Sequence, residues 1–406
     1  MHDHGEQCVP AHTVAPATLL ANPAGPDRDL SWLLSSSASG SVVVVDSDRS
    51  YLAHWAAEHW ASESGARAVF VHCAADDTAR MSSIRRLVAD ASATDSSVPS
   101  ADPESSTTGR VGVILIQFNA HDLTAACLES LYETTYADKQ VYLLENASSD
   151  LSTLQLFLEF PRLQVITAIA RTSYCNAFNL LADKAMRAGC SYLFFVNNDT
   201  RGFSPDLFEH LISDLSPEIA LVSPRIYDFT QADIHWRPRT KWGISWDLAT
   251  EAYLVDSAAW NRLGGFTSSF VMYCEDLDFL LRLRAIGMDA RLNTDVKLDH
   301  MGGAAVRTML FVPTFFYMRN LLWLQRRAFG RVSRSEASNV AQSVRATVVQ
   351  SASLLRSKEF TLGIRKLAYV AAGLTAGVLT RPRDNRPGEM AESLRRSTWP
   401  LKFRIR

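Results

Sequence analysis

Runs of apolar residues alternate with amphipathic stretches over much of the chain. Four short apolar runs are typical of buried strands: 111–116, 141–144, 164–168 and 192–196. Two stretches between them place apolar residues at helical spacing: 123–132 and 175–188. Strands that alternate with helices form a parallel sheet covered on both faces. Residues 110–325 are therefore predicted to form an α/β domain with a mostly parallel sheet.

A smaller pattern of the same kind precedes this domain. Residues 41–91 are predicted to form a small α/β accessory unit, from alternating strand-like and helix-like segments: 42–45, 51–62, 68–71 and 81–91. Residues 1–40 are rich in Ala, Pro, Ser and Gly without periodicity, which predicts a disordered leader. Residues 92–109 are rich in Ser, Thr, Pro and Asp and are predicted to be a linker.

Residues 326–406 are predicted to be a basic helical extension. From residue 319 to residue 406 there are 18 Lys and Arg against 5 Asp and Glu. The longest apolar run, 367–379, has 13 residues, fewer than the ~18 that cross a bilayer. Two interpretations stay open: the extension lies on an anionic membrane surface, or it is a helical cap folded against the preceding domain.

The composition excludes several classes of protein. With 406 residues, 47% hydrophobic and 21% charged, and a net charge of −2, the chain has the composition of a globular protein of two or three units. Whole-chain disorder, collagen and small disulfide-rich folds are excluded. The six cysteines lack zinc-ligand spacing, and residues 1–6 lack the start of a signal peptide. We therefore expect free thiols, a cytoplasmic location and no nucleic-acid partner.

Clusters that contain polar residues follow three of the predicted strands: Gln117, Phe118 and Asn119; Glu145 and Asn146; Asn197, Asn198 and Asp199. In open α/β sheets, ligands bind beyond the carboxyl ends of the strands. A carboxylate and amides at the third strand end are hard oxygen ligands that suit Mg²⁺ or Mn²⁺ carrying a diphosphate. The alternative at this point is an Asx-turn that ends the strand.

Three acidic residues open a predicted amphipathic helix soon after Gly264, Gly265 and Phe266: Glu275, Asp276 and Asp278. Negative charge is favourable at a helix start, and Asp278 can pair with Arg282. One carboxylate held among others and partly desolvated would instead suit general-base chemistry. Glu275 and Asp278 share a helix face, and Asp276 points about 100° away.

His300 lies in a Gly-flanked loop, 299–303. Such a histidine can approach a metal ion closely. The alternative is a solvated loop histidine with no ligand.

Together these segments resemble family 2 glycosyltransferases of the GT-A fold, in particular the bacterial rhamnosyl- and galactofuranosyltransferase branch. The resemblance covers roughly residues 111–325 and says nothing about residues 1–109. The matching motifs are Phe118-Asn119, 145–150, Asn197-x-Asp199 as a form of the D-x-D motif, Gly264-Gly265-Phe266, 273–278 with Arg282, 300–303 and 316–320.

The resemblance implies a role for most of these residues. Asp276 would be the catalytic base, and Asp199 and His300 would ligate Mg²⁺ or Mn²⁺. Glu145 would contact the nucleobase and Asn197 the ribose. The remaining donor-side residues would be Phe118, Asn119, Asn146, Arg171 and Asn198. The acceptor side would comprise Gly264, Gly265, Phe266 and Glu275. Arg319 and Asn320 receive no role.

The implied reaction is an inverting, metal-dependent transfer of a sugar from a nucleotide-diphosphate donor to a hydroxyl of a glycan or lipid-linked acceptor. This chemistry serves cell-surface polysaccharide synthesis, and the basic extension would hold the protein at the inner face of the cell membrane.

Two departures from the family pattern favour the alternative of a non-catalytic GT-A paralogue that acts as an interaction module. Ser173 replaces a glycine, and Asn197 replaces the first acid of D-x-D. The intact Asp199, Asp276 and His300 favour an enzyme. A nucleotidyltransferase is disfavoured because no Gly-rich loop with a Lys accompanies the first strand.

Overall fold

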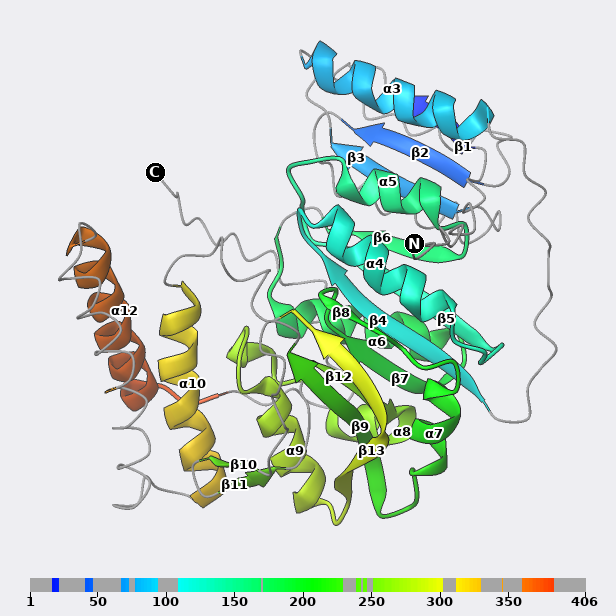
Figure 1. Cartoon of the computed structure of the whole chain (residues 1–406). Coiled ribbons are helices and arrows are strands. Elements are labelled where there is room, and N and C mark those ends of the chain that lie inside the picture. The colour runs from blue at the N-terminus through cyan, green and yellow to red at the C-terminus, as the bar shows by residue number, and fades with distance from the viewer. Residues whose placement is uncertain are drawn as a thin grey trace, which may run out of the picture. The chain divides into compact units, whose positions relative to one another are not determined.

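The computed structural model describes twelve stretches of the chain (Figure 1): 17–21, 41–46, 67–72, 77–93, 109–168, 171–228, 239–241, 244–246, 251–301, 312–329, 345 and 360–382. The expected helix 51–62, most of the expected linker and most of 326–359 lie outside these residues. The chain divides into two compact units. Unit 1 comprises Met1–Pro103, Gln117–His121 and Val141–Ala170. Unit 2 comprises Glu104–Ile116, Asp122–Gln140 and Arg171–Arg406.

Unit 1 contains two groups of parallel strands. Strands β1, β2 and β3 pair in this order, and β5 pairs with β6. Strand β1 lies within the segment for which the sequence predicts disorder. The elements are β1 Ala17–Ala21, β2 Ser41–Asp46, β3 Arg67–His72, α3 Thr78–Ala93, β5 Lys139–Glu145, α5 Ser152–Glu159 and β6 Leu163–Thr167.

One hydrophobic cluster joins the N-terminal elements of unit 1 to α5. Ile84 and Val88 lie four residues apart on α3 and therefore share the face of α3 that contributes to this cluster. The cluster comprises Val69, Val71, Ile84, Val88, Leu154, Phe157 and Leu158. A β-α piece of ~50 residues buries too little apolar surface to be stable alone. The contact with α5 supplies part of the core that β3 and α3 need.

Unit 2 is built on a mixed sheet in which neighbouring strands follow the order β4-β7-β12-β9-β13-β8. The pairs β4–β7 and β9–β13 are parallel, whereas β12 runs antiparallel to both of its neighbours. Strand β8 is antiparallel to β13. The strands are β4 Arg110–Gln117, β7 Cys190–Val196, β8 Thr200–Arg201, β9 Ile219–Asp228, β12 Ala252–Asp256 and β13 Asp289–His300. A separate antiparallel pair joins β10 (Arg239–Lys241) and β11 (Ile244–Trp246).

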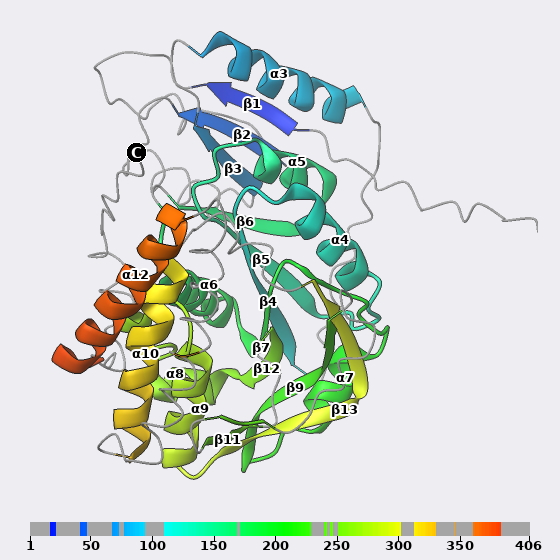
Figure 2. The ribbon, with the colours of Figure 1, turned by 60° about the vertical axis from the view of Figure 1, so that its left-hand side comes forward.

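Helices cover both faces of this sheet (Figure 2). Side chains alternate between faces along a strand, so Phe194 packs against Phe208 of α7 while Phe195 packs against Trp260 of α8. The helices of unit 2 before residue 300 are α4 His121–Tyr132, α6 Tyr174–Arg187, α7 Leu207–Ser213, α8 Ser257–Leu263 and α9 Glu275–Ala285, with a short 3₁₀ turn, η1, at Ser268–Phe270. The predicted α/β class is confirmed. The strands after residue 200 run in both directions. The β-α alternation in the sequence before residue 200 does not predict this.

Two helices near the C-terminus lie side by side in both views (Figures 1 and 2): α10 Val312–Phe329 and α12 Phe360–Leu379. Their close approach depends on two glycines of α12. A Cβ atom on Gly373 would lie 2.5 Å from the Phe315 carbonyl oxygen, and one on Gly377 would lie 2.9 Å from that of Arg319. Among the described residues, no helix has the length and apolarity to cross a bilayer.

Candidate active site

The two predicted metal ligands lie together in unit 2. Strand β8 pairs with the end of β13 and brings His300 opposite Thr200, the residue after Asp199. The Nε2 atom of His300 lies 3.0 Å from Oδ1 of Asp199, and both side chains are largely buried. The Met301 N–H also donates to the Asp199 carbonyl oxygen. His300 is therefore not a solvated loop residue, since the sheet fixes it beside a carboxylate.

The asparagines before Asp199 have protein partners of their own. The Tyr174 hydroxyl donates to Asn197 Oδ1 at 2.7 Å, and Asn198 Nδ2 donates to Thr124 Oγ1 at 2.8 Å. The Thr200 N–H closes a turn onto the Asn197 carbonyl oxygen. The strand end thus forms a turn and also delivers Asp199 to the edge of the sheet, so the two interpretations of the sequence are compatible.

Tyr174, the first residue of α6, connects the Asp199 edge to the acidic cluster. Burial raises the pKa of its hydroxyl well above its ordinary value, and the carboxylates of Glu275, Asp276 and Asp199 raise it further. The hydroxyl therefore keeps its proton at neutral pH and donates to Asn197. The sequence analysis did not assign Tyr174 a role. Its position within the unusual stretch 171–175 was the available signal. Arg171, at the start of that stretch, is exposed.

The three acids at the start of α9 have different environments. Asp278 is fully buried and forms ion pairs with Arg282 of α9 (2.9 Å) and Arg327 of α10 (2.7 Å). It also accepts a hydrogen bond from the Thr267 hydroxyl. The expected Asp278–Arg282 pair is thus present. The sequence analysis missed Arg327, which lies 49 residues further along the chain.

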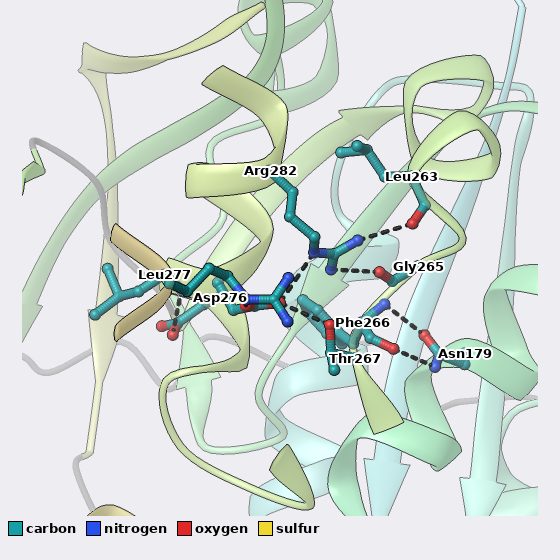
Figure 3. Close-up of polar contacts among 10 residues, drawn as sticks. Asn179, Leu263, Gly265, Phe266, Thr267, Asp276, Leu277 and Arg282 are labelled. Atoms are coloured by element: carbon teal, nitrogen blue, oxygen red, sulfur yellow. Dashed lines mark hydrogen bonds and ion pairs between the residues drawn. The ribbon is translucent and has the colours of Figure 1, made fainter. Parts of the chain in front are cut away.

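Glu275 is buried and Asp276 is partly exposed. Burial raises the pKa of Glu275 well above its ordinary value of 4.5, and the neighbouring carboxylates of Asp276 and Asp278 add to the shift. Its Oε2 atom has no hydrogen-bond partner among the described residues. Asp276 Oδ1 accepts from the Leu277 N–H at 2.7 Å (Figure 3). The raised proton affinity expected in this cluster therefore falls on Glu275, while Asp276 is the acid that solvent reaches.

The loop before these acids is fixed by side chains from two helices (Figure 3). Arg282 donates to the carbonyl oxygens of Leu263 and Gly265, at 2.8 and 2.7 Å. Asn179 of α6 makes a two-way pair with the Phe266 backbone. Gly264 and Gly265 have φ angles of 70° and 68°, a region that favours glycine. The Phe266 ring is buried among core aromatic rings. Gly264, Gly265 and Phe266 thus shape the predicted acceptor-side loop through their backbone.

The predicted donor-side residues of unit 1 form one hydrogen-bonded loop. Asn119 donates to Ser149 Oγ (2.9 Å) and accepts from the Ser149 N–H (2.7 Å). The Glu145 carboxylate is buried and accepts from the Ser148 N–H and from the hydroxyls of Ser148 and Thr153. Burial raises the pKa of Glu145, and these hydrogen bonds oppose the shift.

Two further features of unit 1 complete this loop. The Asn146 N–H donates to the Gln117 carbonyl oxygen at 2.9 Å, and Phe118 is half-buried beside Asn119. Arg80 of α3 donates to the carbonyl oxygens of Ser149 and Asp150, at 2.8 and 3.0 Å. The N-terminal elements thus support the loop that follows β5. Arg80 lies outside the family resemblance, so the motif comparison could not indicate it.

The Asp199–His300 pair thus lies just beyond the end of β7, and α9 of the same unit begins with carboxylates. The model of the family Glycosyl transferase family 2 matches residues 112–279. These residues are similar to that family, and the chain is a glycosyltransferase. The rhamnosyl- and galactofuranosyltransferase branch stays a prediction.

Several solved structures are similar to the chain at low identity. The mannosyltransferase PcManGT from Pyrobaculum calidifontis, in complex with GDP-Man and Mn²⁺, is 16% identical with a TM-score of 0.45, over 74% of this chain and 94% of that one. S. aureus TarS 1–349 is 10% identical with a TM-score of 0.41, over 66% and 91% of the two chains. GalNAc-T7 with UDP, GalNAc and Mn²⁺ is 12% identical with a TM-score of 0.42, over 64% and 57%. No curated protein matches the chain.

Proposed function

We propose that this glycosyltransferase moves a sugar, with inversion, from a nucleotide-diphosphate donor to a hydroxyl of a glycan or lipid-linked glycan. The observation that carries the proposal is the arrangement around Tyr174. Its hydroxyl bonds Asn197 at the Asp199 strand end, and it lies within electrostatic reach of Glu275, Asp276 and Asp199. A cation-binding carboxylate, Asp199, and a candidate base, Asp276, would then act on the same bound substrate.

Asp199 and His300 fit a divalent metal ion. A carboxylate oxygen and an imidazole nitrogen lie 3.0 Å apart on adjoining segments, so both could turn toward one cation. The described residues hold no group of three or more His, Cys, Asp or Glu that could bind a metal. Mg²⁺ sites commonly use one or two protein ligands and complete their shell with water and substrate phosphates. When bound, Mg²⁺ or Mn²⁺ would neutralise negative charge on the leaving diphosphate.

Asp276 is proposed to accept the proton of the acceptor hydroxyl as that hydroxyl attacks the anomeric carbon. Its partial exposure allows a substrate to reach it, whereas Asp278 is enclosed by two arginines. Burial raises the pKa of Glu275, and its Oε2 atom has no hydrogen-bond partner among the described residues, so Glu275 is proposed to contact an acceptor oxygen. Phe118, Asn119, Glu145 and Asn146 are proposed to bind the nucleoside of the donor, with Glu145 ordering the loop.

The test is a screen of nucleotide-diphosphate sugars with and without Mn²⁺. A bound donor raises the unfolding temperature by mass action. We expect one class of donor to stabilise the protein when the metal is present, and to be slowly hydrolysed without an acceptor. If no donor either stabilises the protein or is hydrolysed, the non-catalytic interaction module becomes the better explanation.

We further propose that the C-terminal region places the protein on an anionic membrane surface, where lipid-linked acceptors reside. Helix α12 leaves Ile364, Val378 and Leu379 exposed, by 49, 57 and 76%. The basic excess after residue 319 complements anionic lipid, at about 1 kcal/mol for each Lys or Arg near the surface. In vesicle flotation we expect binding to anionic vesicles only. It should weaken in Leu379→Ser but not in the control Ala372→Ser on the same helix.

A further inference from the structure

The turn that leads into α9 has an unusual backbone. Val271, Tyr273 and Cys274 have φ angles of 69°, 65° and 66°, in the left-handed region that residues other than glycine rarely adopt. Such conformations cost ~1–3 kcal/mol each and persist only where their surroundings enforce them. Cys274 is the N-cap of α9, so this turn decides where Glu275 and Asp276 begin the helix.

Two adjacent residues of α10 hold this turn. Asn320 Nδ2 donates to the carbonyl oxygens of Phe270, Met272 and Tyr273, at 2.9, 2.7 and 2.8 Å. Arg319 Nη2 donates to the carbonyl oxygens of Ser269 and Phe270, at 2.7 and 2.9 Å. Asn320 is fully buried, so water does not compete for its amide. These contacts span the positions with positive φ.

Arg319 also orients the Asn320 amide. Its Nε donates to Asn320 Oδ1 at 2.9 Å, which leaves the amide nitrogen facing the three carbonyl oxygens. The guanidinium carbon lies 4.0 Å from the ring centre of Trp323 and 4.8 Å from that of Phe316. Burial lowers the pKa of Arg319 to about 10, so the group stays charged at neutral pH. The pair therefore forms a fixed set of donors on a rigid helix.

We infer that Arg319 and Asn320 are positioning residues for the reaction. By holding the turn 269–274 they set the start of α9, and with it the carboxylate of Asp276. This inference rests on the proposed role of Asp276 as the base. Both residues lie beyond residue 279, where the family match ends.

A purely structural contact between α10 and the rest of unit 2 is the competing explanation. It predicts a loss of stability without a specific effect on turnover. The matched control is Arg326, on the same helix, which donates to the carbonyl oxygens of Gly377, Val378 and Thr380 in and just after α12. Arg326→Ala also removes hydrogen bonds from α10, but none of these reaches the turn.

The experiment compares Asn320→Leu, Arg319→Lys and Arg326→Ala in the full chain. Asn320→Leu keeps most of the volume and removes the donors. We expect its kcat to fall by about 10²-fold, the cost of a small misplacement of a reacting group, with unchanged donor affinity. Arg319→Lys, a milder change, should lower kcat less. Arg326→Ala should keep the wild-type kcat. Amide hydrogen exchange in the peptide 268–279 should accelerate only in the first two variants.

Equal kcat values in wild type and both turn variants would overturn the inference, as would an equal loss in Arg326→Ala. If Asn320→Leu does not fold, Arg319→Lys decides by the same criteria. If the wild type transfers no sugar, it is the proposed function that fails. Hydrogen exchange then still decides whether the two residues hold the turn, because it requires no activity.

Discussion

Asp278 of α9 and Arg327 of α10 form an ion pair, 2.7 Å between Oδ1 and Nε, in which the Asp278 side chain is completely buried. Arg282 pairs with the other carboxylate oxygen at 2.9 Å. Replacing a buried carboxylate that has two guanidinium partners by a neutral side chain is costly, because it leaves two largely buried positive charges without a counter-charge.

Asp278→Asn should therefore reduce stability more than it reduces chemistry. Removing one partner of a buried pair costs about 3–5 kcal/mol, which thermal or urea unfolding would detect. Asp183→Asn is the control, since Asp183 pairs with Arg187 at the same spacing on a helix surface. Exposed pairs of that kind are worth at most ~1 kcal/mol. Equal losses in the two variants would contradict the buried-pair argument.

Asp276→Asn should abolish most transfer while the protein still folds and binds donor. The substitution keeps the shape of the side chain and removes its basicity, so the rate should fall by ~10²–10⁴-fold. Steady-state transfer and donor titration measure the two effects separately. Near-normal turnover, or loss of donor binding, would mean that the base is another residue.

Asp199→Ala and His300→Ala should each weaken the metal dependence of donor binding. Both side chains would ligate one cation, so removal of either lowers its affinity. Donor titration at a series of Mn²⁺ concentrations measures the effect. The control is His210→Ala, which removes a surface histidine paired with Asp206. An unchanged Mn²⁺ requirement in either site variant would exclude that residue as a ligand.

Glu275 should make folding stability depend on pH. Its folded-state pKa lies above the ordinary value of 4.5, chiefly through burial and then through Asp276. The buried protonated form is thus favoured, and the stabilisation is complete below pH 4.5 and is lost as the pH rises through the folded-state pKa. Tyr174 and Cys175 also face this carboxylate and stay protonated, because burial raises the pKa of each.

The measurement is the unfolding free energy of the wild type and of Glu275→Gln between acid and neutral pH. The unfolding free energy of Glu275→Gln should increase relative to that of the wild type as the pH rises. The exposed Glu209→Gln provides a control for a change of net charge. Parallel curves for wild type and Glu275→Gln would show that Glu275 titrates alike in the folded and unfolded chain.

Arg80→Ala should weaken donor binding although Arg80 lies outside the family match. It anchors the carbonyl oxygens of Ser149 and Asp150, in the loop that Glu145 and Asn119 order. Loss of a hydrogen bond worth about 1 kcal/mol would raise Kd by about fivefold. Arg85→Ala, on the exposed face of α3, is the control. Identical Kd values for the two variants would remove α3 from the donor site.

The sequence by itself determined the local elements. Apolar runs such as 192–196 specify buried strands because their side chains must leave water on both faces of a sheet, and β7 forms there. The acids of 275–278 specify a helix start, and α9 begins at Glu275. The family resemblance also implied that Asp199 and His300 lie together although they are about a hundred residues apart, and their side chains are 3.0 Å apart in the structure.

Only the tertiary structure decided which atoms meet. Asp278 and Arg282 are neighbours on one helix turn, so spacing predicts their pair, but no periodicity links Asp278 to Arg327 or Asn320 to the carbonyl oxygens of 270–273. Those contacts depend on how α10 packs against the rest of unit 2, a long-range outcome of burial rather than of local propensity. The folded surroundings also raise the pKa of Glu275, because desolvation is a property of those surroundings and not of the residue type.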